Sequence, residues 1–357
     1  MLRYRKPVAM LWLVVSCVGA NCEPVQPPWT RPAAASASGS QSVLTGVTRV
    51  GGRLVAIGER GLVILSDDQG RTWQQAKVPV SVTLCAVQFV DAKSGWVVGH
   101  SGVVLRTHDG GSTWTKQLDG SQIPALLSAE ASASGQASVA KTAHQFEQDG
   151  PDKPLLDVMF IDAQRGWVVG GYGLILRTDN GGATWVSQMS KVDNPKGLSI
   201  YAIATDGKST FLAGEQGYLA RSDAAGNDFR KVAMPVGSSF FTMLALPGRL
   251  FVGGLGGVLL DSIDGAASWH QIKTGTDSSI VSLQSSAGRQ LLVGGQGGEV
   301  MKVDLEQSDR LSTLGVSPAR TLHAFTRSAG GQVLTVGFRG AIALPISETE
   351  SQPTKVN

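Results

Sequence analysis

Short apolar runs bounded by glycine and polar turn residues recur along the body of this chain. Val97-Val98 and Val103–Leu105 flank one glycine pair, and Val168-Val169 and Leu174–Leu176 flank another. Runs this short and this rich in Val, Leu and Ile are typical of strands, and none repeats at helical spacing over ten positions. Because the runs are continuous rather than alternating, we expect sheets with both faces buried.

The glycine pair between these runs has the pattern Gly-x-x-Gly and occurs seven times. Successive first glycines lie 41, 71, 44, 39, 41 and 43 residues apart, and the long interval indicates an insertion. The other intervals are close to the 40–45 residues expected of a four-stranded propeller blade. The pairs are Gly58/Gly61, Gly99/Gly102, Gly170/Gly173, Gly214/Gly217, Gly253/Gly256, Gly294/Gly297 and Gly337/Gly340.

A second motif, Ser/Thr-x-Asp-x-Gly-x-Thr-Trp, follows the pair at a fixed distance. It is complete at 66–73 and 107–114, has Asn for Asp at 178–185, lacks the glycine at 262–269 and is degenerate at 222–229. The motif is typical of a tight hairpin, in which the carboxylate accepts backbone N–H bonds, Gly adopts positive φ and the aromatic packs over the sheet. The predicted structural residues are Asp68, Gly70, Trp73, Asp109, Gly111, Trp114, Asn180, Gly182, Trp185, Asp264 and Trp269.

Together the two motifs resemble the Asp-box, or bacterial neuraminidase, repeat of many β-propellers. The longer unit from Phe89-Val90-Asp91 through Gly95-Trp96 to Thr113-Trp114 recurs from Phe160-Ile161-Asp162 to Thr184-Trp185. This unit resembles the photosystem II stability and assembly factor family, over about Trp29 to Ile346. The resemblance implies an all-β, seven-bladed propeller. It implies a role in photosystem II assembly only where the host is photosynthetic.

The seventh repeat is one strand short. Trp29-Thr30-Arg31-Pro32 is similar to the Trp-led segments after the other boxes, such as Trp73–Ala76. We therefore predict that the N-terminal segment completes the last blade and closes the ring, which removes an exposed edge. The predicted organisation is a signal peptide at 1–20, a propeller at 21–347 and a polar tail at 348–357.

The insertion spans about 118–154, and its Ala/Ser-rich middle predicts either a flexible loop or a loose helix. In a propeller, the connection between blades emerges on the same rim as the glycine turns. The tips of those turns vary while their frame is constant, which is typical of a binding face but also of unconstrained loops. The tip residues predicted to contact a partner are Arg60, His100, Tyr172, Gln216, Phe338 and Arg339.

The first twenty residues combine Arg3, Arg5 and Lys6 with the apolar run 8–15 and end at Val18-Gly19-Ala20, as a cleaved secretory signal does. The run is too short to span a membrane, and Cys17 behind small residues offers a lipidation site as the alternative. No other stretch approaches spanning length, so we predict no transmembrane segment in the mature chain. Without the leader, 28 basic and 28 acidic residues balance, and the charge gives no reason to expect nucleic acid as a partner.

Arg106, Arg177 and Arg221 occupy one repeat position and would form a basic band around the ring, or serve as structural residues. A sialidase needs an arginine cluster and a Tyr–Glu pair, and no tyrosine has a glutamate partner in motif context. The histidines lack ligand spacing and the glycine turns lack the Lys-Ser/Thr of a phosphate loop. We therefore predict no enzyme activity, no metal site and no cofactor.

The resulting prediction is an exported, non-enzymatic scaffold in the periplasm, or the thylakoid lumen of a photosynthetic host, that binds a membrane-associated protein client. The alternative is a carbohydrate-binding or sialidase-like propeller.

Overall fold

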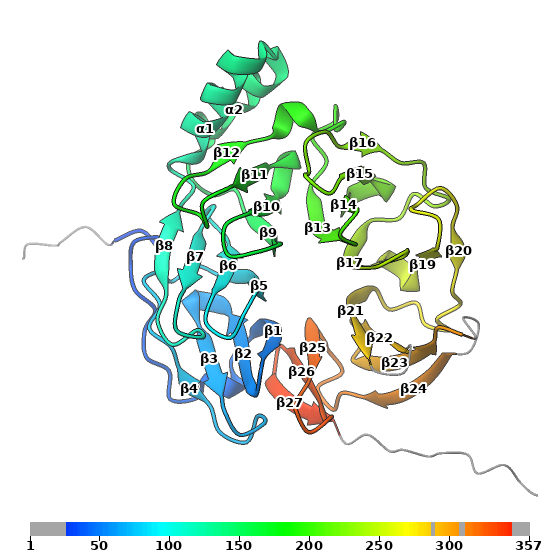
Figure 1. Cartoon of the computed structure of the whole chain (residues 1–357). Helices are drawn as coiled ribbons and strands as arrows, with labels where there is room; N and C mark the ends of the chain where they lie inside the picture. The colour runs from blue at the N-terminus through cyan, green and yellow to red at the C-terminus, as the bar shows by residue number, and fades with distance from the viewer. Residues whose placement is uncertain (1–25, 287–289, 307–310, 345–357) are drawn as a thin grey trace, which may run out of the picture.

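Seven antiparallel sheets stand in a ring around a common axis in the computed structural model, which describes residues 26–286, 290–306 and 311–344 (Figure 1). We number the sheets as blades 1 to 7 in chain order and call the strands of a blade A to D, from the axis outward. The predicted seven-bladed propeller is confirmed. The predicted signal peptide, Cys17 and the tail at 348–357 lie outside the described residues.

Blades 1 to 3 each have four strands in sequence order across the sheet. They comprise β1 (Leu44–Val50), β2 (Arg53–Gly58), β3 (Val63–Ser66) and β4 (Gln74–Gln75); β5 (Leu84–Phe89), β6 (Gly95–Gly99), β7 (Val104–Thr107) and β8 (Thr115–Leu118); and β9 (Leu155–Phe160), β10 (Gly166–Gly170), β11 (Ile175–Thr178) and β12 (Val186–Ser187).

Blades 4 to 6 have the same order, and blade 7 has three strands among the described residues. They comprise β13 (Ile200–Thr205), β14 (Ser209–Gly214), β15 (Leu219–Asp223) and β16 (Arg230–Lys231); β17 (Phe240–Leu246), β18 (Arg249–Gly254), β19 (Leu259–Ser262) and β20 (His270–Gln271); β21 (Ile280–Ser286), β22 (Gln290–Gly295), β23 (Glu299–Asp304) and β24 (Leu311–Val316); and β25 (Ala324–Arg327), β26 (Val333–Gly337) and β27 (Gly340–Leu344).

The hydrophobic core is divided among the interfaces between neighbouring blades. Trp96 of blade 2 stacks on Phe160 of blade 3, with ring centroids 3.6 Å apart and planes within 8° of parallel. The interface between blades 7 and 1 is built in the same way, with Leu44 and Ile64 packed against Val336. Because both faces of a blade are covered by its neighbours, the strands need continuous apolar runs, as the sequence has.

The predicted closure by the N-terminal segment is wrong in its detail. Instead of adding a fourth strand to blade 7, the segment runs along the outside of blade 1, where Ala33 N donates to Val78 O at 3.1 Å. Trp29 packs into the core shared by blades 1 and 2, and its carbonyl accepts from Lys116 Nζ. This apolar contact favours the path along blade 1. The ring closes through the core between blades 7 and 1 and through His323 Nδ1, which lies 2.8 Å from Leu44 O.

The insertion forms two helices, α1 (Ile123–Ser134) and α2 (Ala137–Asp149), which project from the ring beside blade 3 (Figure 1). Proline in the first turn of α1 suits a helix start, and Gly135 ends the helix with a φ of 69°. Leu127 and Phe146 are 0% and 2% exposed, because they anchor the hairpin to the core of blades 2 and 3. Of the two predictions for the middle of the insertion, a flexible loop or a loose helix, the structure shows helix.

Candidate functional site

The B–C turns all lie on one rim of the ring, together with the connections that lead from one blade to the next. Gly58 ends β2 where a Cβ atom would lie 2.2 Å from Val43 O, and Gly61 has a φ of 73° and would place a Cβ 2.0 Å from Val80 O. Neither position has room for a side chain. The two glycines are fixed by the connection packed beneath them, and the two residues between them are free to vary.

In the fifth and sixth repeats the turn is displaced by one residue from the predicted pair. In the fifth, Phe240 pairs with Gly254 rather than Gly253, and the turn ends at Gly257. In the sixth, Ile280 pairs with Gly295 rather than Gly294, and Gly298 N donates to Gly295 O at 2.9 Å. The consecutive glycines at 294–295 and 297–298 made both alignments fit the sequence.

The six predicted contact residues, which we call the turn rim, are all exposed. They are Arg60, His100, Tyr172, Gln216, Phe338 and Arg339. Tyr172 and Phe338 are 52% and 58% exposed despite their size, and Leu255 on the blade 5 turn is 52% exposed. The three residues belong to three separate blades, so each is a single exposed apolar side chain and they do not form one continuous patch.

The helical hairpin extends the turn rim at blade 3. The rings of Phe146 and Tyr172 meet edge to face with centroids 5.8 Å apart, and Lys153 Nζ lies 5.6 Å from the Tyr172 centroid. Glu130 of α1 accepts hydrogen bonds from Met189 N and Ser190 N of the next connection, which fixes the hairpin to blade 3. The exposed face of Tyr172 is thus held rigidly beside the hairpin.

A surface hollow of about 390 Å³ opens between this hairpin and the connection that precedes it. Its lining consists of Gly120, Ser121, Pro124, Ala125, Ser128, Phe146, Glu147, Gly150 and Pro151. The hollow places small and apolar groups close to the turn rim, with Glu147 as its carboxylate.

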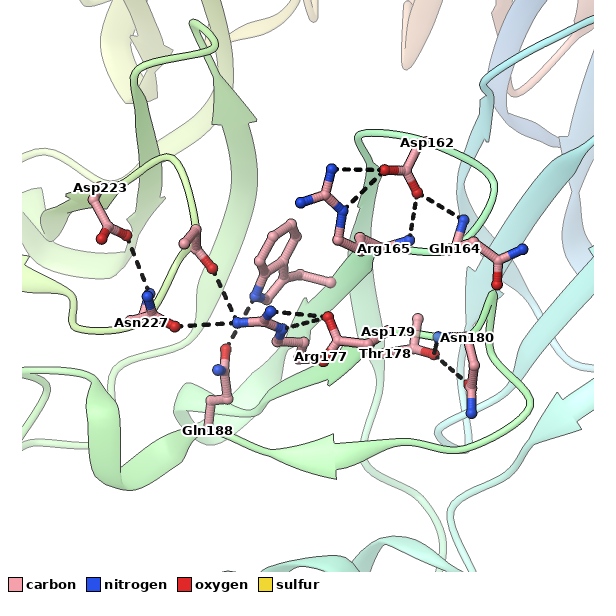
Figure 2. Close-up of polar contacts among 12 residues, drawn as sticks. Asp162, Gln164, Arg165, Arg177, Thr178, Asp179, Asn180, Gln188, Asp223 and Asn227 are labelled. Carbon is pink, nitrogen blue, oxygen red and sulfur yellow. Dashed lines mark hydrogen bonds and ion pairs between the residues drawn. The ribbon is translucent and has the colours of Figure 1, made fainter.

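The Asp boxes lie at the C–D turns, on the rim opposite the turn rim. In the first box, Asp68 Oδ1 accepts from Ser66 Oγ and Thr72 N, and Asp68 Oδ2 accepts from Thr72 Oγ1 at 2.6 Å. These bonds favour the charged carboxylate and lower the pKa of Asp68 to about 2. Trp73 Nε1 donates to Gly70 O and closes the hairpin. In the third box Asn180 takes the place of Asp and bonds Thr178 (Figure 2).

The predicted basic band consists of arginines that are already bonded. Each donates to the carbonyl of the fourth residue in the next blade's box. Arg177, for example, reaches Ala225 O at 3.0 Å and Asn227 Oδ1 at 3.3 Å across the blade boundary while pairing with Asp179 (Figure 2). These three arginines therefore act as structural residues that join neighbouring blades, which was the alternative to a basic band. The bonds in order are Arg106 to Gly181 O, Arg177 to Ala225 O and Arg221 to Gly265 O, and Arg53 makes the equivalent bond to Gly110 O.

One Tyr–Glu pair was missed by sequence reasoning. Tyr201 Oη donates to Glu215 Oε1 at 3.0 Å, although 14 residues separate them, because strand A and the B–C turn of blade 4 meet there. The pKa of Tyr201 is raised to about 12, mainly through burial, and the pKa of Glu215 is lowered mainly by its bond from Ser199 N. The three arginines expected beside such a pair in a sialidase are instead bonded on the opposite rim.

Within the part of the chain that the structure describes, no three His, Cys, Asp or Glu side chains come together as metal ligands would. The same residues include no helix with the length and apolar character needed to cross a membrane.

The chain was compared with protein-family models, curated proteins and solved structures. The model described as "Photosynthesis system II assembly factor YCF48" matches residues 23–129 and 137–333. "Photosystem II assembly lipoprotein Ycf48" of Synechococcus sp. (strain CC9902) is 28% identical over 189 residues, which are 49% of this chain and 56% of that protein. The chain therefore spans about half the length of the curated relatives it matches.

Among solved structures, "YCF48 bound to D1 peptide" has a TM-score of 0.62 at 14% identity, over 87% of this chain and 95% of the other. The WD40 propeller domain of Doa1 has a TM-score of 0.64 at 9% identity, over 88% and 95% of the two chains. Two proteins with different names fit about equally well, so the structural likeness shows the fold alone. The relatives in sequence are named as assembly factors, which does not support the carbohydrate alternative.

Proposed function

We infer the function of this chain from its family: it belongs to the photosystem II assembly factor YCF48 family. We propose that it is a non-enzymatic assembly factor that holds a membrane-protein client on the turn rim and the adjoining helical hairpin. The observation that carries the proposal is the exposed ring of Tyr172 on the turn rim, which packs edge to face on Phe146 of the hairpin beside the surface hollow.

The client is proposed to be a membrane protein that offers an extended peptide. One relative's structure is titled as bound to D1 peptide, and that protein shares this propeller fold. In a photosynthetic host the client would be of that kind, and in another host a different membrane protein would take its place. Rigid turns with variable tips suit such a change of client, because the frame is independent of the tips.

We further propose that the chain is exported. A curated relative is named as a lipoprotein, which supports acylation at Cys17 as one route, and cleavage after Ala20 is the other. The mass of the mature N-terminal peptide, purified from the host, separates the two routes. The acylated protein contains a diacylated Cys17, whereas the cleaved form starts at Asn21.

The function is tested by affinity purification from solubilised membranes. In one variant a short Gly-Ser linker replaces residues 123–149, and in a second Tyr172 and Phe338 are both changed to Ser. The matched control is Ile263→Ser, which removes a side chain that is 73% exposed on the opposite rim. We expect one dominant membrane protein with the native chain and the control, and at least tenfold less of it with both variants. Equal recovery from all four proteins would show that the turn rim does not bind the client.

A further inference from the structure

Among the described residues, blade 7 ends in a strand that has no further strand on its outer side. In blades 1 to 6 the third strand is covered by a fourth, whereas β27 is the outermost described strand of its sheet (Figure 1). The sequence Gly-Ala-Ile-Ala-Leu of β27 contains no charge and no proline, which are the usual protections of an exposed edge. Ile342 is half-buried and Ala343 is exposed, so this edge is accessible.

A recurring hydrogen bond defines what this edge would accept. In four blades, the residue that follows strand D donates its N–H to the carbonyl of the first residue of strand C. The bonds are Ala76 N to Val63 O, Gln188 N to Ile175 O, Val232 N to Leu219 O and Ile272 N to Leu259 O, at 2.9–3.1 Å.

The register places Ala341 O at the equivalent point of blade 7, since Val336 pairs with Ala341 as Ile57 pairs with Val63. Among the described residues, no donor outside the β26–β27 hairpin bonds this carbonyl. A further extended segment is therefore the structural complement of the edge.

The charged residues of β24, of blade 7 and of the connection between them have one sign. From Leu311 to Leu344 the chain contains Arg320, Arg327 and Arg339 but no Asp or Glu. Arg327 is bonded to Gly331 O and Ser286 Oγ, while Arg320 and Arg339 are exposed and pair with no carboxylate that the structure describes. An acidic segment is the electrostatically favoured one.

We propose that the edge of β27 binds an extended, acidic peptide segment as an antiparallel fourth strand of blade 7, with one N–H of the segment donating to Ala341 O. Binding of this kind is β-augmentation, in which main-chain hydrogen bonds supply most of the affinity. The site lies on the outer edge of the ring and shares only Arg339 with the turn rim. A Cβ on Gly340 would lie 1.9 Å from Ser40 O, so the 3-10 turn at Gly39–Gln41 closes one end of the edge. An open edge this short suits a single extended segment better than the sheet of a second copy.

The test uses the full chain carrying Ala343→Cys and a probe peptide copied from its own blade 5, Ser268–Thr274, in which Lys273→Glu makes the probe acidic. In blade 5, His270 of this segment pairs with Asp261, the counterpart of Ala343, and Gln271 faces the other side of the sheet. Paired positions place Cα atoms within the range of about 4.4–6.8 Å that a disulfide allows. The probe therefore carries His270→Cys, and the matched control peptide carries Gln271→Cys. Cys85 is an internal reference, because burial raises the pKa of its thiol to about 12.

We expect the in-register probe to form a disulfide with the cysteine introduced at position 343 at least tenfold faster than the control peptide. A probe with Ile272→Pro, which lacks the N–H for Ala341 O, should lose that advantage. A probe that keeps Lys273 should react several-fold more slowly at low salt, and equal rates with and without Lys273 would overturn the acidic preference. Equal rates for the two cysteine positions would overturn the proposal. Predominant dimers of the Ala343→Cys chain, joined through position 343 in the presence of the probe, would also overturn it, since the edge would then pair with a second copy. Changing Tyr172 and Phe338 to Ser, the variant that tests the turn rim, leaves Arg320, Arg339 and the β27 edge in place and should leave this result unchanged, so the two proposals fail independently.

Discussion

Arg106 Nη1 of blade 2 donates to Gly181 O of blade 3 at 2.8 Å, and its guanidinium lies 5.1 Å from the Trp96 ring centroid. Trp96 Nε1 donates to the same carbonyl at 3.2 Å. A cation and an indole from one blade thus converge on the Asp-box turn of the next. The repeat-locked arginines join neighbouring blades, and their position is explained without a ligand.

Arg106→Ala should destabilise the propeller by about 1–3 kcal/mol, because a charged donor is lost from a partly buried carbonyl and from an aromatic face. The measurement is urea unfolding followed by tryptophan fluorescence. Arg165→Ala is the control: Arg165 is exposed and bonds only its near neighbour Asp162, so a change within about 0.5 kcal/mol is expected. Equal effects of the two substitutions would contradict the role of the bond between blades.

Gly58→Ala should cost about 2–4 kcal/mol, since the added methyl would meet Val43 O at 2.2 Å and backbone must move to admit it. Gly52→Ala, where nothing lies within 4 Å, is the matched control and should be close to neutral. Thermal unfolding of both variants measures the two changes in stability. A Gly58→Ala protein as stable as the control would show that the turn frame is not fixed by this contact.

The carboxyl group of Asp157 should make the protein less stable as pH rises. Its carboxylate, on the innermost strand of blade 3, accepts from Ile203 N of blade 4 at 2.9 Å, and desolvation raises its pKa to about 7. The native state therefore holds a proton that the unfolded chain releases near pH 4. The free energy of unfolding should fall between about pH 4 and pH 7, by up to about 2–4 kcal/mol from this group.

Asp157→Asn should remove most of that fall, because the amide stays neutral over the whole range. Urea unfolding of the native chain and the variant at pH 4.5, 6 and 7.5 provides the comparison. Parallel pH profiles for the two proteins would contradict the raised pKa of Asp157.

The carboxyl group of Asp68 should have the opposite effect at lower pH, where the protein becomes less stable as pH falls. Hydrogen bonds from Thr72 and Ser66 lower the pKa of this carboxyl to about 2, so its contribution is complete above about pH 4 and is lost as pH falls toward 2. Asp68→Asn should flatten the acid limb of the stability profile. Circular dichroism between pH 4 and pH 2 measures it, and an acid limb that is identical in the two proteins would contradict the lowered pKa of Asp68.

The fold could be predicted from the sequence because the blades repeat the same local requirements. These are two glycines packed against a connection between blades, a box residue with fixed hydrogen bonds, and apolar runs that cover both faces of the sheet. Contacts between repeats were harder to predict from the sequence. Trp29 resembles the tryptophan before each fourth strand, but that resemblance encodes an aromatic packed on a sheet edge and does not specify which blade provides the edge. Tyr201 and Glu215 are joined by topology alone, so residue spacing offered no signal for their pair.

The structural role of the three arginines could have been predicted from the sequence. Arg106, Arg177 and Arg221 each stand directly before a box, and the carbonyls they reach stand at one position of the following box. A residue locked to a repeat motif is most simply explained by a bond to the next repeat. The turn rim shows the converse, since its residues vary and their exposure could be established only from the structure.

The most direct test of the assembly-factor account is photo-crosslinking in cells from one residue on each rim. A photoreactive phenylalanine analogue replaces Tyr172 in one protein and Ile263 in the other, which are 52% and 73% exposed. The account predicts a single membrane-protein adduct from position 172 and at least tenfold less of it from position 263. An adduct of equal strength from both positions, or one confined to position 263, would contradict the claim that the turn rim holds the client.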